Sequence, residues 1–381
     1  MLLTLKKDTL LSVLQNYIQI VKPNIIKGFE NILCTYNKES QELIFLGGDG
    51  TVIIRTSYPE KLDLVSDFSF AVPGQLFISM ISSLSKQDIS INIQDNEMLI
   101  TDGKSKFKLN IVVGSEYPIN DLVVSGESWF EISGKLVKKL MQPVNFCLDS
   151  HKVRPALAGI MLNIFSDKVK SVGSDAKEMM EVTIPVSIPR LDGQDNVKVI
   201  LPANSVRILQ KIIEDDDEQV VFYITPSFAT IGYKNILFET LLINSVYPEY
   251  ESKISFDSVD VEVTANKSEI KSLINRALIC MERNDMPKTL CRFENNTLNF
   301  SGGDAKSHFE ETIPTNGYSG DERSLLLNIR RVKDILNVIE TDDVSIKIGK
   351  ELSRDPLFFV NTSPSEGYSF WTFIMPLRNV D

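Results

Sequence analysis

Apolar side chains recur every three or four positions in six segments of the chain, the spacing that places them on one face of an α-helix. In the third segment, Val137, Leu140, Met141 and Val144 follow this rule, and lysines occupy positions between them. Such a pattern predicts helices that are buried along one stripe and face solvent along the other. The predicted helices span residues 9–22, 74–86, 135–146, 204–213, 266–279 and 328–339.

Alternation of apolar and polar residues follows several of these helices, as expected for antiparallel strands with one dry face and one wet face. Residues 89–93 alternate strictly, and apolar positions resume after Asp95-Asn96, a pair suited to a tight turn. Residues 289–293 show the same alternation before a second turn at Asn295-Asn296. The sequence therefore predicts hairpins between the helices.

Residue types suited to helix starts support the helical segments. Asp8 and Asn266 precede two of them and are good N-cap residues, because a side-chain oxygen can accept from the free amides of the first turn. Pro73 and Pro202 precede two others, where a missing amide costs little.

A short turn rich in glycine and aspartate occurs once in each third of the sequence. Its aspartates are Asp49, Asp175 and Asp304, which lie 126 and 129 residues apart. A repeat with this period indicates three similar domains, each with two helices and antiparallel sheets. Tyr-Pro pairs at residues 117–118 and 247–248 close the first two thirds. We therefore predict an α+β fold with domains at residues 1–125, 126–256 and 257–381.

The 381-residue chain has a formal net charge of −11, which by itself argues against nucleic acid as a partner. However, the six helical segments together carry +11, so the remainder of the chain carries −22. A single basic helical face is most often simply solvated. Six such faces in an acidic, repeating protein favour a shared positive surface that meets a polyanion.

Repeats arranged about an axis with these faces inward would line a positive hole inside a negative exterior. Lysine and arginine contacts to phosphates carry no sequence information, so a duplex held in this way could slide. We therefore expect duplex DNA to be bound without sequence preference. The predicted DNA-binding residues are Lys22, Lys27, Lys86, Lys135, Lys138, Lys139, Arg207, Lys211, Lys271, Arg276, Arg330 and Lys333.

Several kinds of chemistry lack the residues that they need. The four cysteines form no CxxC pair and the chain has two histidines, so no metal site is expected. No Walker-type loop, GxSxG elbow or HExxH run occurs, and residues 47–50 are better explained as a turn than as a nucleotide-cyclase loop. We expect no catalytic site and no cofactor. The lack of a long apolar run and of a signal-peptide pattern favours a cytoplasmic protein without membrane contact.

The whole chain resembles the beta-subunit (sliding clamp) family of bacterial DNA polymerase III. The resemblance rests on the helix entries Val72-Pro73 and Leu201-Pro202 and on three motifs in order. These motifs are residues 153–160 (Val-Arg-Pro-Ala-Leu-Ala-Gly-Ile), 247–250 (Tyr-Pro-Glu-Tyr) and 373–378 (Phe-Ile-Met-Pro-Leu-Arg). The resemblance implies a head-to-tail homodimer of six domains that closes into a ring around duplex DNA. It also implies a non-enzymatic processivity factor that tethers the replicative DNA polymerase and is opened by a clamp loader.

Members of this family bind partner peptides in a hydrophobic pocket between the second and third domains. Methionine and leucine give such a pocket an adaptable apolar surface. Carried over by motif, its lining would be Arg154, Leu157, Ser174, Asp175, Ala176, Lys177, Met179, Pro248, Phe373, Met375, Pro376, Leu377 and Arg378.

The chain departs from the family pattern in three places. Where the family commonly has Gly-His-Arg-Leu after the aspartate, residues 176–179 read Ala-Lys-Glu-Met, which removes an arginine and adds an acid. An arginine often found after the Tyr-Pro-x-Tyr motif is replaced around residues 251–253. Lys22 takes the place of an arginine after the first helix, which keeps the charge and loses a bidentate phosphate contact. These departures predict an altered preference for partner peptides.

A second interpretation is also consistent with the sequence. A β-rich structural protein of a virion or appendage, whose basic helices contact acidic neighbouring subunits, would have the same composition. It would not encircle DNA, so only retention on closed circles separates the two.

Overall fold

The turn that repeats in the sequence forms the tip of a β-hairpin. The computed structural model describes residues 2–119, 121–124, 130–148, 154–188, 196–254, 256–281, 286–303, 306–352, 354–363 and 367–377. At the first tip, Asp49 Oδ1 accepts hydrogen bonds from the backbone amides of Thr51 and Val52, each at 2.8 Å. At the second tip, Asp175 Oδ1 accepts from the amides of Lys177 and Glu178 at 2.7 and 3.0 Å. The third aspartate, Asp304, lies outside the described residues.

The first glycine of each turn allows a close approach by the segment that follows a helix. A Cβ atom built on Gly47 would lie 2.5 Å from the Tyr17 ring, and one on Gly173 would lie 2.6 Å from Val144 Cγ1. Real Cβ atoms do not come this close to other heavy atoms, so a larger residue would displace the packing. The glycine in the repeated motif is therefore a packing requirement, and it recurs because the packing recurs.

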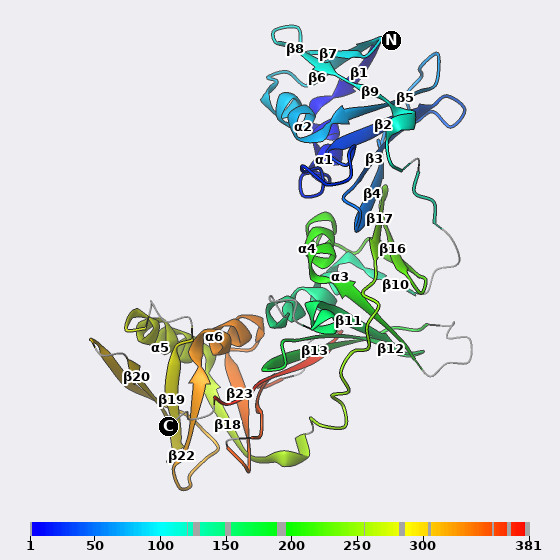
Figure 1. Cartoon of the computed structure of the whole chain (residues 1–381). Coiled ribbons are helices and arrows are strands. Elements are labelled where there is room, and N and C mark those ends of the chain that lie inside the picture. The colour runs from blue at the N-terminus through cyan, green and yellow to red at the C-terminus, as the bar shows by residue number, and fades with distance from the viewer. Residues whose placement is uncertain are drawn as a thin grey trace. The chain divides into compact units, whose positions relative to one another are not determined.

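One compact unit of the structure is built mainly from Met1–Lys138 and Leu201–Ile243. It contains a four-stranded sheet and a nine-stranded sheet, both antiparallel (Figure 1). The four-stranded sheet has the order β1 (Leu2–Lys6), β6 (Asp88–Gln94), β7 (Glu97–Thr101) and β8 (Lys106–Asn110). The nine-stranded sheet has the order β10 (Phe130–Ser133), β15 (Gln219–Ile224), β16 (Phe228–Tyr233), β17 (Ile236–Leu241), β4 (Val52–Ser57), β3 (Glu42–Gly48), β2 (Asn31–Asn37), β5 (Phe68–Pro73) and β9 (Val112–Val113).

The second compact unit is built mainly from Lys139–Ser187 and Asn244–Asp381. Its eight-stranded sheet has the order β14 (Val197–Pro202), β11 (Gly159–Ile164), β12 (Lys168–Ser174), β13 (Glu178–Pro185), β25 (Ser369–Ile374), β24 (Leu357–Asn361), β23 (Asp343–Gly349) and β18 (Val259–Asn266). A four-stranded sheet has the order β21 (His308–Pro314), β20 (Thr297–Gly303), β19 (Lys288–Glu294) and β22 (Arg323–Asn328).

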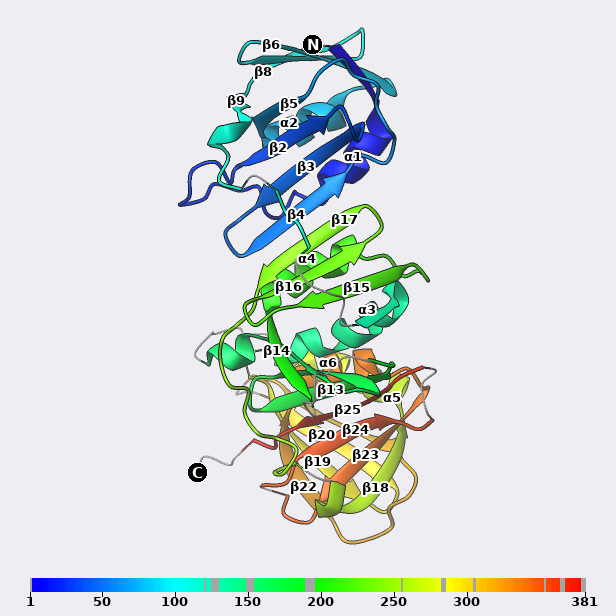
Figure 2. The same cartoon turned by 90° about the vertical axis from the view of Figure 1, so that its right-hand side faces the viewer.

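Strands from different thirds of the chain pair directly at two places, which we call the first and second seams. At the first seam, β4 pairs antiparallel with β17, with Thr56 opposite Ile236 and Val52 opposite Thr240. At the second seam, β13 pairs antiparallel with β25, with Glu178 opposite Ile374. Figure 2 shows both pairs of neighbouring strands. Each seam continues one sheet from one third of the sequence into the next.

Six α-helices are present in the described residues, as the hydrophobic pattern predicts, although the first three are shorter than predicted, the second (residues 74–86) ending at Ser83. The first predicted helix (residues 9–22) ends early, and hydrogen-bonded turns continue to residue 20. In the third (residues 135–146), Pro143 cannot continue the helix and a 3-10 turn follows. The helices are α1 (Lys7–Gln15), α2 (Gly74–Ser83), α3 (Gly134–Met141), α4 (Ala203–Ile212), α5 (Lys267–Ile279) and α6 (Ile329–Val338). The part of the chain that the structure describes also contains four 3-10 helices, at Gly114–Glu116, Pro143–Cys147, Pro155–Ala158 and Phe256–Ser258.

The helix starts test the predicted caps. Asn266 caps α5, because its side chain accepts from the amides of Ser268 and Glu269. The prediction for Asp8 is wrong, since α1 begins at Lys7 and Asp8 lies inside its first turn, where it accepts from Gln87 Nε2 at 2.6 Å.

The buried faces of α5 and α6 pack together over β-strands in one hydrophobic core of the second unit. None of the helices that the structure describes is long and apolar enough to span a membrane. The domain boundaries near residues 125 and 256 remain predictions.

Candidate partner pocket and DNA-facing helices

A cavity of about 140 Å³ opens beside the second seam, where the chain leaves β25. The end of this strand is fixed on both sides, since the Met375 amide donates to the Lys177 carbonyl at 2.7 Å and the Leu377 amide donates to the Leu326 carbonyl at 2.8 Å. These bonds hold the Met-Pro-Leu segment between the β12–β13 turn and β22. The cavity is lined by Lys177, Met286, Asn328, Arg331, Ile374, Met375, Pro376 and Leu377.

Arg331 is a cationic side chain that lines this cavity, as is Lys177. Its Nη2 lies 2.6 Å from Asp175 Oδ2 and its Nη1 lies 2.7 Å from Glu178 Oε1. The side chain of Glu178 is only 6% exposed, and its Oε2 has no hydrogen-bond partner among the described residues. Burial raises the pKa of Glu178 to about 7, although Arg331 opposes the shift. Glu178 therefore changes its charge near neutral pH.

The structure brings together part of the predicted pocket. Lys177, Met375, Pro376 and Leu377 line the cavity. Met179 and Phe373 are buried opposite each other in the β13–β25 pairing and are not part of the cavity lining. Ser174 is also buried, where its Oγ donates to the Glu178 carbonyl and accepts from the Ala176 amide.

Other predicted residues lie apart from this cavity. Arg154 and Pro248 are exposed and Leu157 is buried, and none of the three belongs to its lining. Arg378 falls outside the described residues. Asp175 acts through the ion pair to Arg331, and Ala176 is exposed at the tip of the turn with φ of +70°.

Sequence reasoning missed Met286, Asn328, Arg331 and Ile374. One signal was available for Arg331, because it follows Arg330 and adjacent residues of a helix point about 100° apart. Two neighbouring arginines in α6 thus cannot share one face. The contact with Glu178 crosses 153 positions of the sequence, and no local pattern reports it.

The Tyr-Pro-Glu-Tyr motif anchors the connection to the last third of the chain. Tyr250 donates from its hydroxyl to the buried Glu181 Oε2 at 2.6 Å. Trp371 of β25 donates from Nε1 to Glu181 Oε1 at 3.2 Å, and Lys170 lies 3.3 Å from that same oxygen. This network ties the motif to both strands of the second seam.

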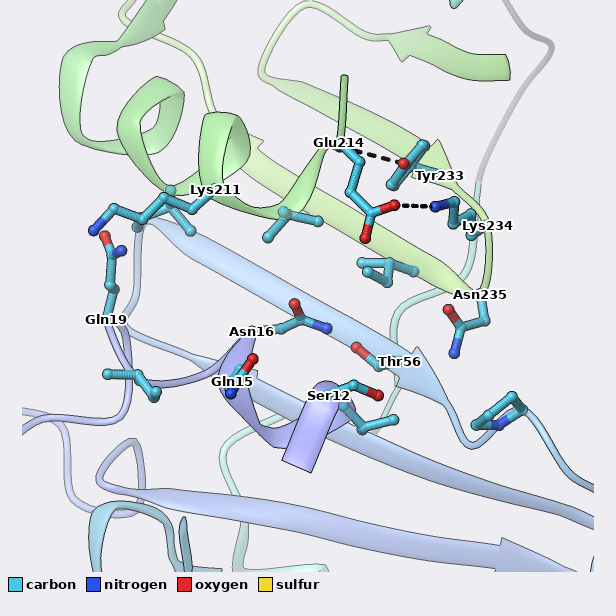
Figure 3. Close-up of a pocket in the computed structure, with 16 residues that line it drawn as sticks. Ser12, Gln15, Asn16, Gln19, Thr56, Lys211, Glu214, Tyr233, Lys234 and Asn235 are labelled. Carbon is cyan, nitrogen blue, oxygen red and sulfur yellow. Dashed lines mark hydrogen bonds and ion pairs between the residues drawn. The ribbon is translucent and has the colours of Figure 1, made fainter. Parts of the chain in front are cut away.

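A larger groove of about 620 Å³ lies beside the first seam (Figure 3). One side is formed by Ser12, Gln15 and Asn16 at the end of α1, and Gln19 and Lys211 lie together at one edge. On the other side, Lys234 lies 2.6 Å from Glu214 Oε2 and 2.9 Å from Asp216 Oδ2. These bonds to Glu214 and Asp216 raise the pKa of Lys234.

The predicted DNA-binding residues differ in the exposure of their side chains and in their ion pairs. Seven are exposed and five are half-buried. Lys139 is held by an ion pair with Glu340 and lies 5.1 Å from the centre of the Tyr368 ring. Arg276 donates from Nε to Glu311 Oε2 at 2.8 Å. The exposed residues are Lys22, Lys27, Lys86, Lys135, Arg207, Lys211 and Arg276, and the half-buried ones are Lys138, Lys139, Lys271, Arg330 and Lys333.

Two family models match this chain over more than half of its length. The model of the DNA polymerase III beta subunit N-terminal domain matches residues 1–121, and that of its central domain matches residues 131–249. Nothing in these matches supports the alternative of a virion or appendage protein.

Relatives that align with nearly the whole chain are also sliding clamps or DNA polymerase III beta subunits. The "Beta sliding clamp" of Staphylococcus epidermidis strain ATCC 35984 is 21% identical over 98% of both chains, and that of Staphylococcus aureus strain Mu50 is 21% identical over 90% of this chain and 92% of the relative. The DNA polymerase III subunit beta of Pseudomonas aeruginosa matches at a TM-score of 0.90, with 19% identity and full coverage of both chains. The DNA polymerase sliding clamp of Bacillus subtilis matches at 0.89 with 20% identity, covering 100% of this chain and 99% of the other. The chain therefore belongs to the DNA polymerase III beta subunit family, the bacterial sliding clamps, as a divergent member.

Proposed function

We propose that this chain is a DNA sliding clamp, a replication processivity factor that encircles duplex DNA and tethers a DNA polymerase. The observation that carries the proposal is the whole-length match to sliding clamps in a chain whose turn, seam and helix pattern repeats. In this role the protein needs no catalytic site of its own. A clamp loader opens the ring, and the pocket beside the second seam receives the polymerase and other partners.

Two sheet edges are suited to closing a ring from two copies. β8 lies at one edge of the first four-stranded sheet, and β21 lies at one edge of the other. Edge strands expose main-chain groups that a further strand can pair with. The exposed positions of β8 include Lys106 and Lys108, whereas β21 carries Glu310 and Glu311. Opposite charges on the two edges favour head-to-tail pairing and disfavour pairing of like edges.

The basic helical faces are suited to phosphate contacts. Lys135 on α3 and Arg207 and Lys211 on α4 are exposed, and the C-terminal end of α1 adds neutral hydrogen-bond donors at Gln15 and at the C-cap residue Asn16. Contacts of this kind hold DNA without reading its sequence, which is what sliding requires.

Light scattering across a dilution series tests ring closure. The expected mass is twice 42.9 kDa. Lys106→Glu alone and Glu310→Lys alone should each shift the equilibrium toward monomer, and the two changes together should restore the dimer, because opposite charges again face each other. Lys86→Glu, which lies on neither edge, is the matched control. A wild-type monomer at every concentration tested, or a dimer indifferent to all these changes, would contradict closure through these edges.

A further inference from the structure

The cavity beside the second seam offers hydrogen-bond donors in an apolar setting. Three of its lining side chains are polar, namely Lys177, Asn328 and Arg331. Lysine and arginine only donate, and Asn328 adds the two N–H donors of its amide beside an Oδ1 that already accepts one bond from the Arg330 amide. The remaining walls are apolar side chains such as Met286, Met375 and Leu377. A ligand that fills this cavity must therefore bring acceptors beside an apolar group.

Arg331 is compensated by carboxylates that lie outside the lining of the cavity. Asp175 and Glu178 bind its guanidinium from the side of the β12–β13 turn. A guanidinium has five N–H donors, so two single contacts leave donors for a third group. In addition, Glu178 keeps Oε2 buried without a hydrogen-bond partner in the described residues, which marks its ionised form as poorly satisfied.

We infer that this cavity is a carboxylate subsite of the partner pocket, in which Arg331 and Lys177 bind an acidic side chain of a partner peptide and Glu178 is the internal counter-charge that the peptide carboxylate replaces. The inference rests on the proposed function, since it specifies the chemistry of the proposed partner pocket. The inference also accounts for the departure from the family pattern at residues 176–179. There the turn lacks the family's arginine and has an acid at residue 178, and the nearby guanidinium belongs to Arg331 on α6.

When a peptide carboxylate replaces Glu178 as the partner of Arg331, peptide binding is coupled to protonation of Glu178. The charged groups around Glu178 are Asp175 in the turn and Arg331 and Asp334 on α6. The nearby Cys147 thiol stays neutral, because burial raises its pKa. A second carboxylate brought to Arg331 disfavours the ionised form of Glu178, since like charges in one buried site repel. At pH 7.5 the peptide should therefore bind together with a proton.

Random heptapeptides displayed on phage with their C-termini fused to the coat protein provide the probe. They are selected against the full chain at pH 6.5, and against the variants Leu377→Ala, Lys177→Gln and the neutral pair Arg331→Gln/Glu178→Gln. The paired change avoids leaving two buried carboxylates uncompensated, and Lys177 is exposed, so both variants should fold. Lys211→Gln is a matched control that removes a lysine from the first groove.

The wild-type chain and Lys211→Gln should enrich apolar peptides that carry aspartate or glutamate. The neutral pair should enrich the same apolar residues without the acid, and Lys177→Gln should weaken the acidic preference. In calorimetry, the amide-capped best peptide should bind about tenfold more tightly than its Asp→Asn form, as expected for a hydrogen bond to a charged group. Proton uptake at pH 7.5 should accompany only the acidic peptide and should vanish in Glu178→Gln.

The binding results distinguish failure of the carboxylate subsite from failure of the whole partner pocket. Peptides that bind Leu377→Ala as well as wild type would overturn the partner pocket itself. Peptides that depend on Leu377 but bind equally as Asp and Asn forms would overturn only the carboxylate subsite. If the Asn form with a free C-terminal carboxylate matches the capped Asp form, the cavity selects chain ends, and the assignment to an acidic side chain is wrong.

Discussion

The two seams share one backbone arrangement and differ in the side chains beside it. At both, an antiparallel strand pair joins successive thirds of the chain next to an aspartate turn. The first seam borders a groove of about 620 Å³, where neutral side chains such as Gln15 and Asn16 line one side and exposed Lys234 pairs with Glu214 and Asp216 on the other. Beside the second seam, Lys139 pairs with Glu340 and Arg331 pairs with two carboxylates, and a cavity of only about 140 Å³ remains.

A repeated fold can acquire function in the side chains beside its strand pairs. Main-chain pairing sets the architecture at both seams, so the side chains around each seam can diverge without changing the fold. At the second seam these side chains include a buried acid and a shared guanidinium, which respond to pH and to an incoming charge. The first seam provides a control within the same molecule for any effect attributed to that chemistry.

The largest expected effect concerns the charge of Glu178. Its raised pKa means that the folded chain holds a proton which the unfolded chain has released between about pH 4.5 and 7. Its contribution to stability therefore falls as pH rises through this window and is constant above it. The free energy of unfolding of Glu178→Gln minus that of wild type should therefore increase by about 2 kcal/mol as the pH rises from 5.5 to 8. Urea denaturation at the two pH values measures this change.

The first seam supplies the control for this measurement. Glu214→Gln removes an exposed acid beside the first groove, and its effect should stay within about 0.5 kcal/mol at both pH values. Equal pH dependence in the two variants would mean that Glu178 is not the group that titrates.

A smaller effect compares the same position in the two aspartate turns. Gly50 and Ala176 both have positive φ, +92° and +70°, which glycine adopts without strain and alanine does not. Gly50→Ala should therefore destabilise by about 1 kcal/mol, and Ala176→Gly should stabilise by a similar amount. Thermal denaturation of both variants checks this, and a change of the same sign in both would contradict it.

The smallest effect concerns Lys139 and DNA. Because Glu340 and Tyr368 hold its side chain, Lys139→Ala should hardly change the slope of DNA affinity against salt concentration. Lys135→Ala removes an exposed cation from the same helix and should reduce the slope by about one. Fluorescence anisotropy over a salt series compares them, and an equal loss in both variants would show that the ion pair opens on DNA.

Local patterns in the sequence predicted much of the fold and only part of the pocket. The six helices followed from apolar spacing, and the hairpins at Asp95 and Asn295 followed from turn residues, since both are local properties. The Met-Pro-Leu segment could be carried over from the family motif. The role of Arg331 could not, because its contacts with Asp175 and Glu178 depend on how β13, β25 and α6 pack. Asp8 failed as a cap because β1 runs directly into α1, which places Asp8 inside the first turn of the helix.

Encirclement of DNA can be measured as retention on closed circles. The chain is loaded onto nicked circular duplex DNA with a clamp loader and separated from free protein by gel filtration at high salt, before and after the circle is cut by a restriction enzyme. The protein should stay with the circle and be lost once the DNA is linear, because a ring can slide off a free end. Retention that is the same on circular and linear DNA would contradict encirclement.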